Sequence, residues 1–194
     1  MSPTHAKRAP AMSAINQQIH HLTVMTTSTK ENFMYPQLFS MIAPNLFQGG
    51  TDDLDVIHLP VTNNRKRTDL PFDAIVTMYA WARPADWNVQ EFRYGVPDAS
   101  IRDIDLDRLR EAVEFGYDRW KQGDRVLVRC QAGLNRSGLV MALILIKDGC
   151  TPEKAIDLIR ESRGEDALFN HDFCTWLLTE GSAFFQTSPS QQAA

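Results

Sequence analysis

The feature that most constrains the fold is a short apolar run, a tight loop and an apolar helix in direct succession. Residues 125–129 (RVLVR) have the composition of a buried central strand, and this run stops at Cys130. From Ser137 to Lys147 the chain is apolar nearly all round, which predicts a helix in the interior of the protein. A buried strand that feeds a buried helix through a short loop indicates an α/β domain.

Three further strands and three further helices are predicted around this unit. The strand candidates are residues 45–48 with the turn Gly49-Gly50, residues 72–79, and residues 91–96. Helices are expected from Asp105 to Gly123, from Thr151-Pro152 to about Arg160, and from Asn170 to Thr179. We therefore expect an α/β fold whose central, mainly parallel sheet is flanked by helices, with a ligand site at the strand-loop-helix junction.

The two ends of the chain differ in composition from its middle. Residues 1–32 are rich in Ser, Thr, Gln, Pro and His, and residues 182–194 are similar apart from Phe184 and Phe185. Such composition is typical of mobile ends. We expect a flexible N-terminal extension (1–32), one domain (33–181) and a flexible C-terminal tail (182–194).

Charge and cysteine content restrict the classes of partner. The net charge of −4 provides no global field that would attract nucleic acid or an anionic membrane, so anion binding must be local. The longest apolar run, Leu139 to Ile146, is too short to span a bilayer. The three cysteines are odd in number and widely spaced, which favours reduced thiols. We expect a cytoplasmic monomer that binds neither membranes nor nucleic acid.

The loop from Cys130 to Arg136 (CQAGLNR) has the properties of a phosphate site. A tight loop that leads into a helix directs backbone N–H groups and the positive end of the helix dipole at one point. Gly133 permits unusual backbone angles, and the planar fork of Arg136 can hold two phosphate oxygens. The same field favours the thiolate form of a cysteine at the end of the strand, and a thiolate attacks phosphorus.

This segment resembles the signature of the protein tyrosine and dual-specificity phosphatase superfamily: a cysteine, five residues, an arginine and a Ser or Thr. The similarity includes residues 46–50, 155–163 and 168–173 and extends over roughly residues 42–180. The resemblance implies a dual-specificity-phosphatase-like fold and a phosphoprotein phosphatase that forms a phospho-cysteine on Cys130, without metal or other cofactor. It assigns phosphate binding to Gln131, Ala132, Gly133, Leu134, Asn135 and Arg136, and it implies that Ser137 helps the thiolate to leave.

The family also supplies an aspartate, from a loop about thirty residues before the cysteine, that protonates the leaving oxygen. Asp98 precedes Cys130 by 32 positions and follows Val96-Pro97 at the end of a predicted strand. Asp103 and Asp105 are the rival candidates, but they lie close to the start of the next helix, where an aspartate more often caps the helix. We therefore expect Asp98 to be the general acid and base.

Two other functions remain open. Gly133-x-Asn135-Arg136 is similar to the loop of RNA 5′-triphosphatases of the same superfamily. Most members carry His before the cysteine where this chain has Arg129, which leaves open a catalytically weak, phosphate-binding pseudophosphatase. Phosphoinositide phosphatases tend to have lysines inside the loop, and this loop has none.

Several residues outside the loop carry alternative interpretations. Trp81, Arg83 and Trp87 either wall the site or pack under a loop. Residues 63–67 (NNRKR) form either a solvated loop or a patch that steers substrate. Cys150 and Cys174 are expected to be structural, although either could pair with Cys130 on oxidation.

Overall fold

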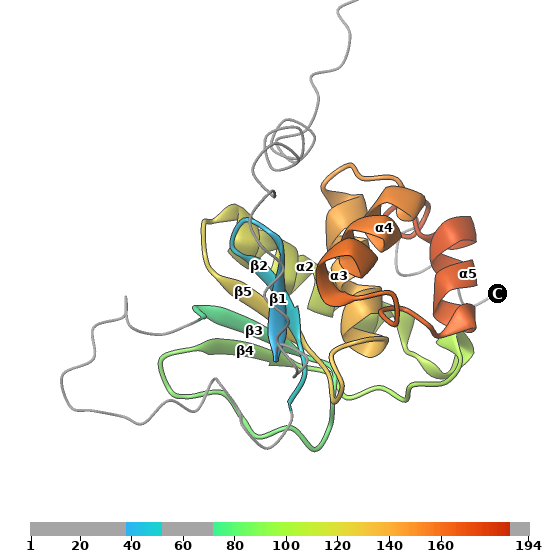
Figure 1. Cartoon of the computed structure of the whole chain (residues 1–194). Helices are drawn as coiled ribbons and strands as arrows, with labels where there is room; N and C mark the ends of the chain where they lie inside the picture. Colours follow the sequence, from blue (N-terminus) through green and yellow to red (C-terminus); the bar gives the residue numbers. More distant parts are fainter. Residues whose placement is uncertain (1–37, 52–71, 187–194) are drawn as a thin grey trace, which may run out of the picture. The chain divides into compact units, whose positions relative to one another are not determined.

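The computed structural model describes residues 38–51 and 72–186 of the chain (Figure 1). Five strands form one sheet in the order β1-β2-β5-β3-β4. They are β1 (Phe39–Ala43), β2 (Leu46–Gly49), β3 (Ala74–Thr77), β4 (Gln90–Arg93) and β5 (Val126–Arg129). Only β1 runs antiparallel to its neighbour β2, whereas β2, β5, β3 and β4 pair in parallel. The prediction of a mainly parallel sheet is confirmed.

Within the described residues, four α-helices and one 3-10 helix follow or connect the strands. They are η2 (Ile101–Asp103), α2 (Leu106–Lys121), α3 (Arg136–Lys147), α4 (Pro152–Arg163) and α5 (His171–Glu180). The side chains of Asp105, Thr151 and Asn170 cap α2, α4 and α5 by accepting hydrogen bonds from first-turn amides. The cap predicted at Thr151 is confirmed, and Asp105 and Asn170 cap their helices in the same way.

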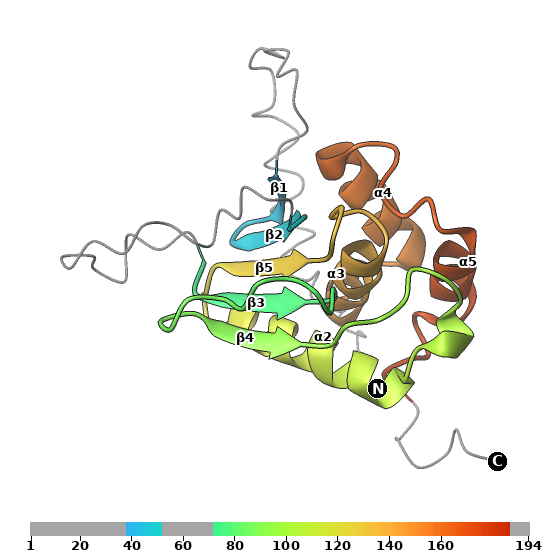
Figure 2. The same ribbon diagram turned by 90° about the horizontal axis from the view of Figure 1, so that it is seen from below.

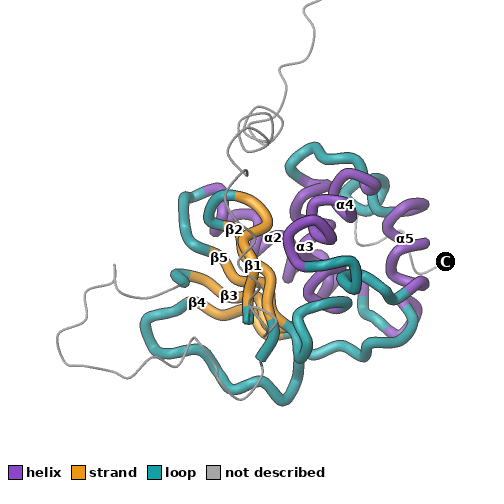
Figure 3. The backbone as a smooth tube through the Cα atoms, viewed as in Figure 1, coloured by secondary structure: helices purple, strands orange, loops and turns teal. Residues whose placement is uncertain are grey.

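The helix α3 is buried along its length, from Arg136 to Ile146. It contacts α2, α4 and α5 as well as β2 and β5. The helices α2 to α5 lie on one side of the sheet, and the four parallel strands lie side by side next to them (Figures 2 and 3). The loop between β3 and β4 covers the other face, where Ala85 and Val89 pack against Ile75 and Leu127. The carboxyl end of β5 thus leads directly into the core of the helical layer.

The strand β1 was not expected from the sequence. It pairs with β2 through a turn in which Asn45 has φ of 64°, a conformation that asparagine tolerates better than most residues. The packed part of the chain also extends past residue 181, because Phe184 is buried against Trp176 and beneath the Arg110 guanidinium. The expectations for residues 1–32, 63–67 and 187–194 lie outside the described residues. Within the described part of the chain, no helix is long and apolar enough to cross a membrane.

Candidate active site

Cys130 lies at the carboxyl end of β5, where the chain turns into α3. Its side chain is buried, while Gln131 and Ala132, which follow it, are exposed. The Cys130 amide donates to the Gly49 carbonyl at the end of β2 at 3.2 Å, so the loop begins in register with the sheet. The sulfur is thus fixed beneath a loop that itself contacts solvent.

The carbonyl groups of residues 131–134 all accept hydrogen bonds from outside the loop. The donors are the Thr51 and Leu168 amides, the Gln48 side chain and the Arg163 guanidinium, at 2.9–3.4 Å. A peptide carbonyl points roughly opposite to the N–H of the same peptide unit. The loop is therefore held from its outer side, and its amides are left to face the centre.

Those amides have no acceptor in the part of the chain that the structure describes. Within the described residues, the backbone N–H groups of residues 131–136 donate no hydrogen bond to another protein group. The helix α3 likewise begins without a side-chain cap, because the Asn135 side chain makes no capping hydrogen bond. The first amides of a helix are satisfied by side chains, water or ligands, and an anion fits the positive end of the helix dipole.

Gly133 makes the sharp turn of the loop possible. Its φ is +75°, in the region that favours glycine, and a Cβ at this position would lie 2.4 Å from the Gly49 carbonyl carbon. No side chain fits this contact. The structure therefore agrees with the backbone role that the sequence predicts for Gly133.

Arg136, the first residue of α3, lies against the loop with its side chain largely buried. Its Nη1 and Nη2 reach the Val96 carbonyl and Gln131 Oε1 only at 3.4 and 3.5 Å, and within the described residues its Nε has no hydrogen-bond partner. The guanidinium lies over the Tyr79 ring, 5.2 Å from its centroid. A buried guanidinium with weak contacts and an unused N–H requires an acceptor.

Ser137 brings its hydroxyl to the cysteine. The Ser137 Oγ lies 3.3 Å from Cys130 Sγ, and both side chains are buried. The hydroxyl can donate to a sulfur that carries negative charge. The structure thus places Cys130, Arg136 and Ser137 on one short loop-helix junction.

Asp98 is joined to the loop through two asparagines. One carboxylate oxygen accepts from Asn135 Nδ2 at 3.1 Å, and the other accepts from Asn170 Nδ2 at 3.0 Å. The Asn170 amide in turn donates to Asn135 Oδ1 at 3.0 Å. The rival Asp105 caps α2, and Asp103 is exposed in η2. Among the described contacts of these three aspartates, only those of Asp98 reach the Cys130 loop.

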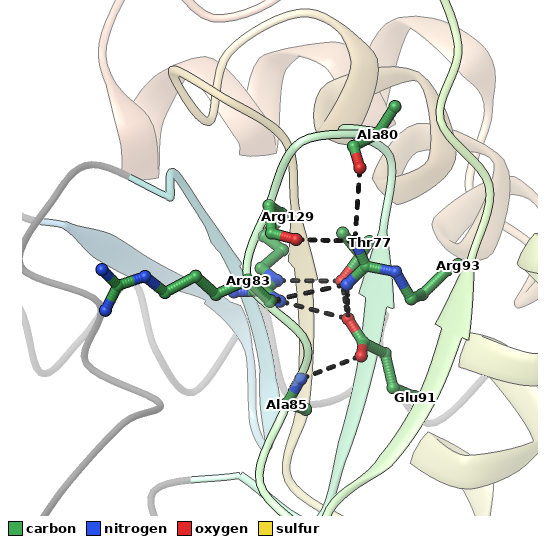
Figure 4. A network of polar contacts seen from close by, with 8 residues as sticks. Thr77, Ala80, Arg83, Ala85, Glu91, Arg93 and Arg129 are labelled. Carbon is green, nitrogen blue, oxygen red and sulfur yellow. Dashed lines mark hydrogen bonds and ion pairs between the residues drawn. The ribbon is translucent and has the colours of Figure 1, made fainter.

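Arg129 is turned away from the cysteine, because successive side chains of a strand point to opposite faces. Its guanidinium is buried and donates to Thr77 Oγ1 at 2.8 Å, to Glu91 Oε1 at 3.1 Å and to the Arg83 carbonyl (Figure 4). Burial raises the pKa of Glu91, but hydrogen bonds from Thr77, Ala85 and Arg129, together with the charge of Arg93, outweigh it and hold the pKa below the ordinary value. Arg129 therefore belongs to an ion-pair cluster behind the loop.

The other two cysteines are placed differently from Cys130. Cys150 follows the far end of α3, about 18 Å along the helix, whereas a disulfide needs Cα atoms within about 7 Å. Burial raises the pKa of the Cys150 and Cys174 thiols. The possibility that Cys150 pairs with Cys130 is excluded by this placement.

The aromatic residues of the loop after β3 do not pack under it. Trp81 is 83% exposed and Trp87 is fully exposed, so the interpretation of buried packing is wrong for both. Gln48, Arg163 and Asn170 support the site but were not assigned to it from the sequence. Their only signal there was the wider family resemblance, because their contacts with the loop span 30 to 86 positions of the chain.

Comparisons with known proteins identify relatives of this chain. The family model "Dual specificity phosphatase, catalytic domain" matches residues 57–182. The rat (Rattus norvegicus) protein "Cyclin-dependent kinase inhibitor 3" is 31% identical over 84 residues, and the match covers 42% of this chain and 39% of the rat protein. The chain thus aligns with less than half of this curated relative.

Solved structures share the fold at low sequence identity. Human DUSP28 superposes with a TM-score of 0.64 and 21% identity, covering 79% of this chain and 98% of DUSP28. PTPMT1, solved in complex with PI(5)P, superposes with a TM-score of 0.58 and 20% identity, covering 77% of this chain and 97% of its own. The family model spans more than half of the chain, and the chain belongs to the dual-specificity phosphatase family.

Proposed function

We propose that the protein hydrolyses phosphomonoesters of phosphorylated proteins through a phospho-cysteine intermediate on Cys130. The observation that carries this proposal is the unpartnered N-terminus of α3, with the unused Nε of Arg136 beside it and Cys130 at its base. Free amides, a buried guanidinium and a sulfur converge there. This arrangement suits a tetrahedral dianion that is to be attacked at its centre.

The first step transfers the phosphoryl group from the substrate oxygen to sulfur. The Cys130 thiolate attacks phosphorus, an S–P bond forms, and the bond between phosphorus and the leaving oxygen breaks. Asp98 donates a proton to that oxygen, and the amides of residues 131–136 with Arg136 stabilise the charge on the three remaining phosphate oxygens. The contacts from Asn135 and Asn170 to Asp98 support this role because they bring the carboxyl group to the loop.

The second step returns the cysteine to its initial state. Asp98, now ionised, takes a proton from water, the water oxygen attacks phosphorus, and the S–P bond breaks to release inorganic phosphate and a thiolate. The Ser137 hydroxyl, 3.3 Å from the sulfur, donates to the thiolate as its charge returns. All electron pairs and protons are accounted for without a metal ion.

The substrate we propose is a phosphoprotein, and the enzyme class we prefer is a dual-specificity phosphatase. Asn135, which suggested an RNA 5′-triphosphatase, has another explanation here because it links Asp98 and Asn170. Arg129, which suggested a pseudophosphatase, directs its guanidinium to Thr77 and Glu91 and not to the sulfur. Both observations favour the phosphatase. We keep the cytoplasm as the proposed location, because the three cysteines are free thiols.

The test is hydrolysis of para-nitrophenyl phosphate across pH with metal ions chelated. Cys130→Ser is expected to abolish turnover. Asp98→Ala should reduce turnover of phenyl phosphate, whose leaving oxygen needs a proton, by about 10²–10⁴-fold, and turnover of para-nitrophenyl phosphate by less. Cys174→Ser and Asp103→Asn are the matched controls, because each removes the same chemical group away from the loop, and both should retain activity.

The outcomes separate the proposed functions. Turnover that survives Cys130→Ser would contradict the phospho-cysteine mechanism. A wild type that binds vanadate but turns over no phosphomonoester would instead support a binding module. Release of the terminal phosphate from 5′-triphosphorylated RNA, with no activity on phosphopeptides, would favour the triphosphatase.

A further inference from the structure

A buried ion-pair cluster lies behind the Cys130 loop, at the carboxyl ends of three neighbouring strands. We call Thr77, Glu91, Arg93 and Arg129 the strand-end cluster. Strand register places Thr77 of β3 opposite both Arg93 of β4 and Arg129 of β5. Glu91 lies on β4 two residues before Arg93, so its side chain is on the same face of the sheet. The cluster therefore bridges β5, β3 and β4 (Figure 4).

Glu91 is the centre of this cluster. Its Oε1 accepts from Thr77 Oγ1, from Arg93 Nη1 at 2.8 Å and from Arg129 Nη2 at 3.1 Å. The side chains of Glu91 and Arg129 are 10% and 1% exposed, so this ion pair has little access to water. Both carry charge in a region from which most solvent is excluded.

The cluster also binds the backbone of the loop after β3. Arg93 Nη2 donates to the Ala82 carbonyl at 2.7 Å, Arg129 Nη2 donates to the Arg83 carbonyl, and Glu91 Oε2 accepts from the Ala85 amide at 2.9 Å. Figure 4 shows that the side chain of Arg83 extends away from the cluster, so only its backbone takes part. These three contacts hold the loop against the sheet.

The strands that the cluster joins lead to the two proposed reacting groups. Arg129 is followed directly by Cys130, and Arg93 precedes Asp98 by five positions. Gly95 lies between Arg93 and Asp98 in the sequence and packs closely on Ala80, because a Cβ added to Gly95 would lie 2.6 Å from the Ala80 Cβ. The loop held by the cluster therefore also contacts the segment that carries Asp98.

Stability alone does not explain such a cluster. Well-packed hydrophobic residues of similar volume are often as stabilising as a buried ion pair, or more so. Catalysis, in contrast, is sensitive to placement, and an error of about 1 Å between reacting groups can cost about 10²-fold in rate. A cluster of directional hydrogen bonds fixes relative position better than apolar packing does.

We propose that Arg129 and Glu91 are positioning residues, which hold the strand of Cys130 and the strand leading to Asp98 in the relation that proton transfer requires. The inference rests on the proposed function. Neither residue touches the substrate, and both act through the segments that they connect. Loss of either should weaken protonation of the leaving oxygen more than it weakens attack by sulfur.

The leaving-group dependence of the rate tests this inference. p-Nitrophenolate leaves readily without a proton, whereas phenolate needs one, so the ratio of kcat/KM for the two phosphate esters reports on the general acid. A smaller folded fraction lowers both rates equally and leaves the ratio unchanged. Arg129→Met and Glu91→Gln are expected to lose roughly 10- to 100-fold more activity on phenyl phosphate than on p-nitrophenyl phosphate, which is part of what a general acid contributes. Arg129→Lys keeps the positive charge, so its ratio should lie between those of the wild type and Arg129→Met.

Three comparisons complete the experiment. Arg119→Met removes an arginine in the last turn of α2 that forms an ion pair with Asp124, and it should leave the ratio unchanged. Asp98→Ala should change the ratio of kcat/KM more than any other variant, because it removes the general acid. Adding Arg129→Met to Asp98→Ala should change the ratio no further. An equal loss on both substrates, or a further selective loss without Asp98, would overturn the inference. A wild type inactive on both esters, or a normal ratio in Asp98→Ala, would instead overturn the proposed function.

Discussion

Glu91 is a charged residue in a mostly buried position, and its ionisation is coupled to folding. Burial raises its pKa, but hydrogen bonds from Thr77, Ala85 and Arg129 with the charge of Arg93 lower it further than burial raises it. In the unfolded chain the glutamate has its ordinary pKa, near the model-peptide value of about 4.3. The unfolded state therefore binds more protons in acid, and the stability contributed by Glu91 is present above that value and is lost as the pH falls through the folded-state pKa.

We expect Glu91→Gln to destabilise the protein at pH 7 by more than it does in acid. The difference in free energy of unfolding between wild type and variant should shrink as the pH falls below about 4.3, since protonation removes the charge that the variant lacks. Urea unfolding at a series of pH values measures this difference. Glu153→Gln, at an exposed first-turn position of α4, controls for the loss of one negative charge. A difference that stays constant from pH 7 to pH 3 would contradict the account.

The loop between β5 and α3 depends on its contact with β2. Gly133 lies against Gly49 with a positive φ, and Gln48 of β2 donates to the Gly133 and Leu134 carbonyls. The end of β2 thus supports the loop from its outer side. A change in this contact would move the amides that face the proposed phosphate.

Gly133→Ala should greatly reduce phosphatase activity and vanadate affinity. The added Cβ would lie 2.4 Å from the Gly49 carbonyl carbon, so the loop has to shift. Gly123→Ala is the matched control, because Gly123 has φ of +92° but an added Cβ meets nothing within 4 Å. The control should lose about 1–2 kcal/mol of stability from backbone strain and keep its activity. Equal loss of activity in both variants would argue against the role of this contact.

Elements with a local signal could be predicted from the sequence. The apolar run before Cys130 indicated β5, and Asp105, Thr151 and Asn170 marked the starts of three helices. The strand β1 lacked such a signal, because its five residues are stabilised by pairing with β2. The strand-end cluster could not be predicted either, since it depends on the register of β3, β4 and β5.

At the scale of the whole molecule, the site is assembled from segments far apart in the sequence. Spacing and loop chemistry were enough to propose Cys130 and Arg136, and the family resemblance added Ser137. All three lie on one loop and one helix. The contacts of Gln48, Arg163 and Asn170 with that loop arise only when β2, α4 and α5 pack around α3. Reactive residues within one loop can be predicted from the sequence, whereas the contacts that hold this loop in place depend on tertiary packing.

Binding of an oxyanion should stabilise the whole fold, because the site exists only in the native state. Ligand at 100 times its Kd stabilises by about 2.7 kcal/mol, which raises the Tm. We expect vanadate to raise the Tm of the wild type and to raise that of Arg136→Lys much less, because an ammonium cannot replace the guanidinium fork. Arg108→Lys, at an exposed ion pair, should respond as the wild type does. An equal rise in Arg136→Lys would exclude Arg136 from the anion site.

The most direct test of the central claim is to trap the phosphorylated protein. A phosphotyrosine peptide would be mixed with the enzyme, the reaction quenched in acid within its first turnovers, and the digested protein analysed by mass spectrometry. We predict a phosphoryl group on the peptide that contains Cys130, absent in Cys130→Ser and unaffected by Cys150→Ser. Turnover with no phosphorylated peptide, or with phosphate on another residue, would contradict the mechanism.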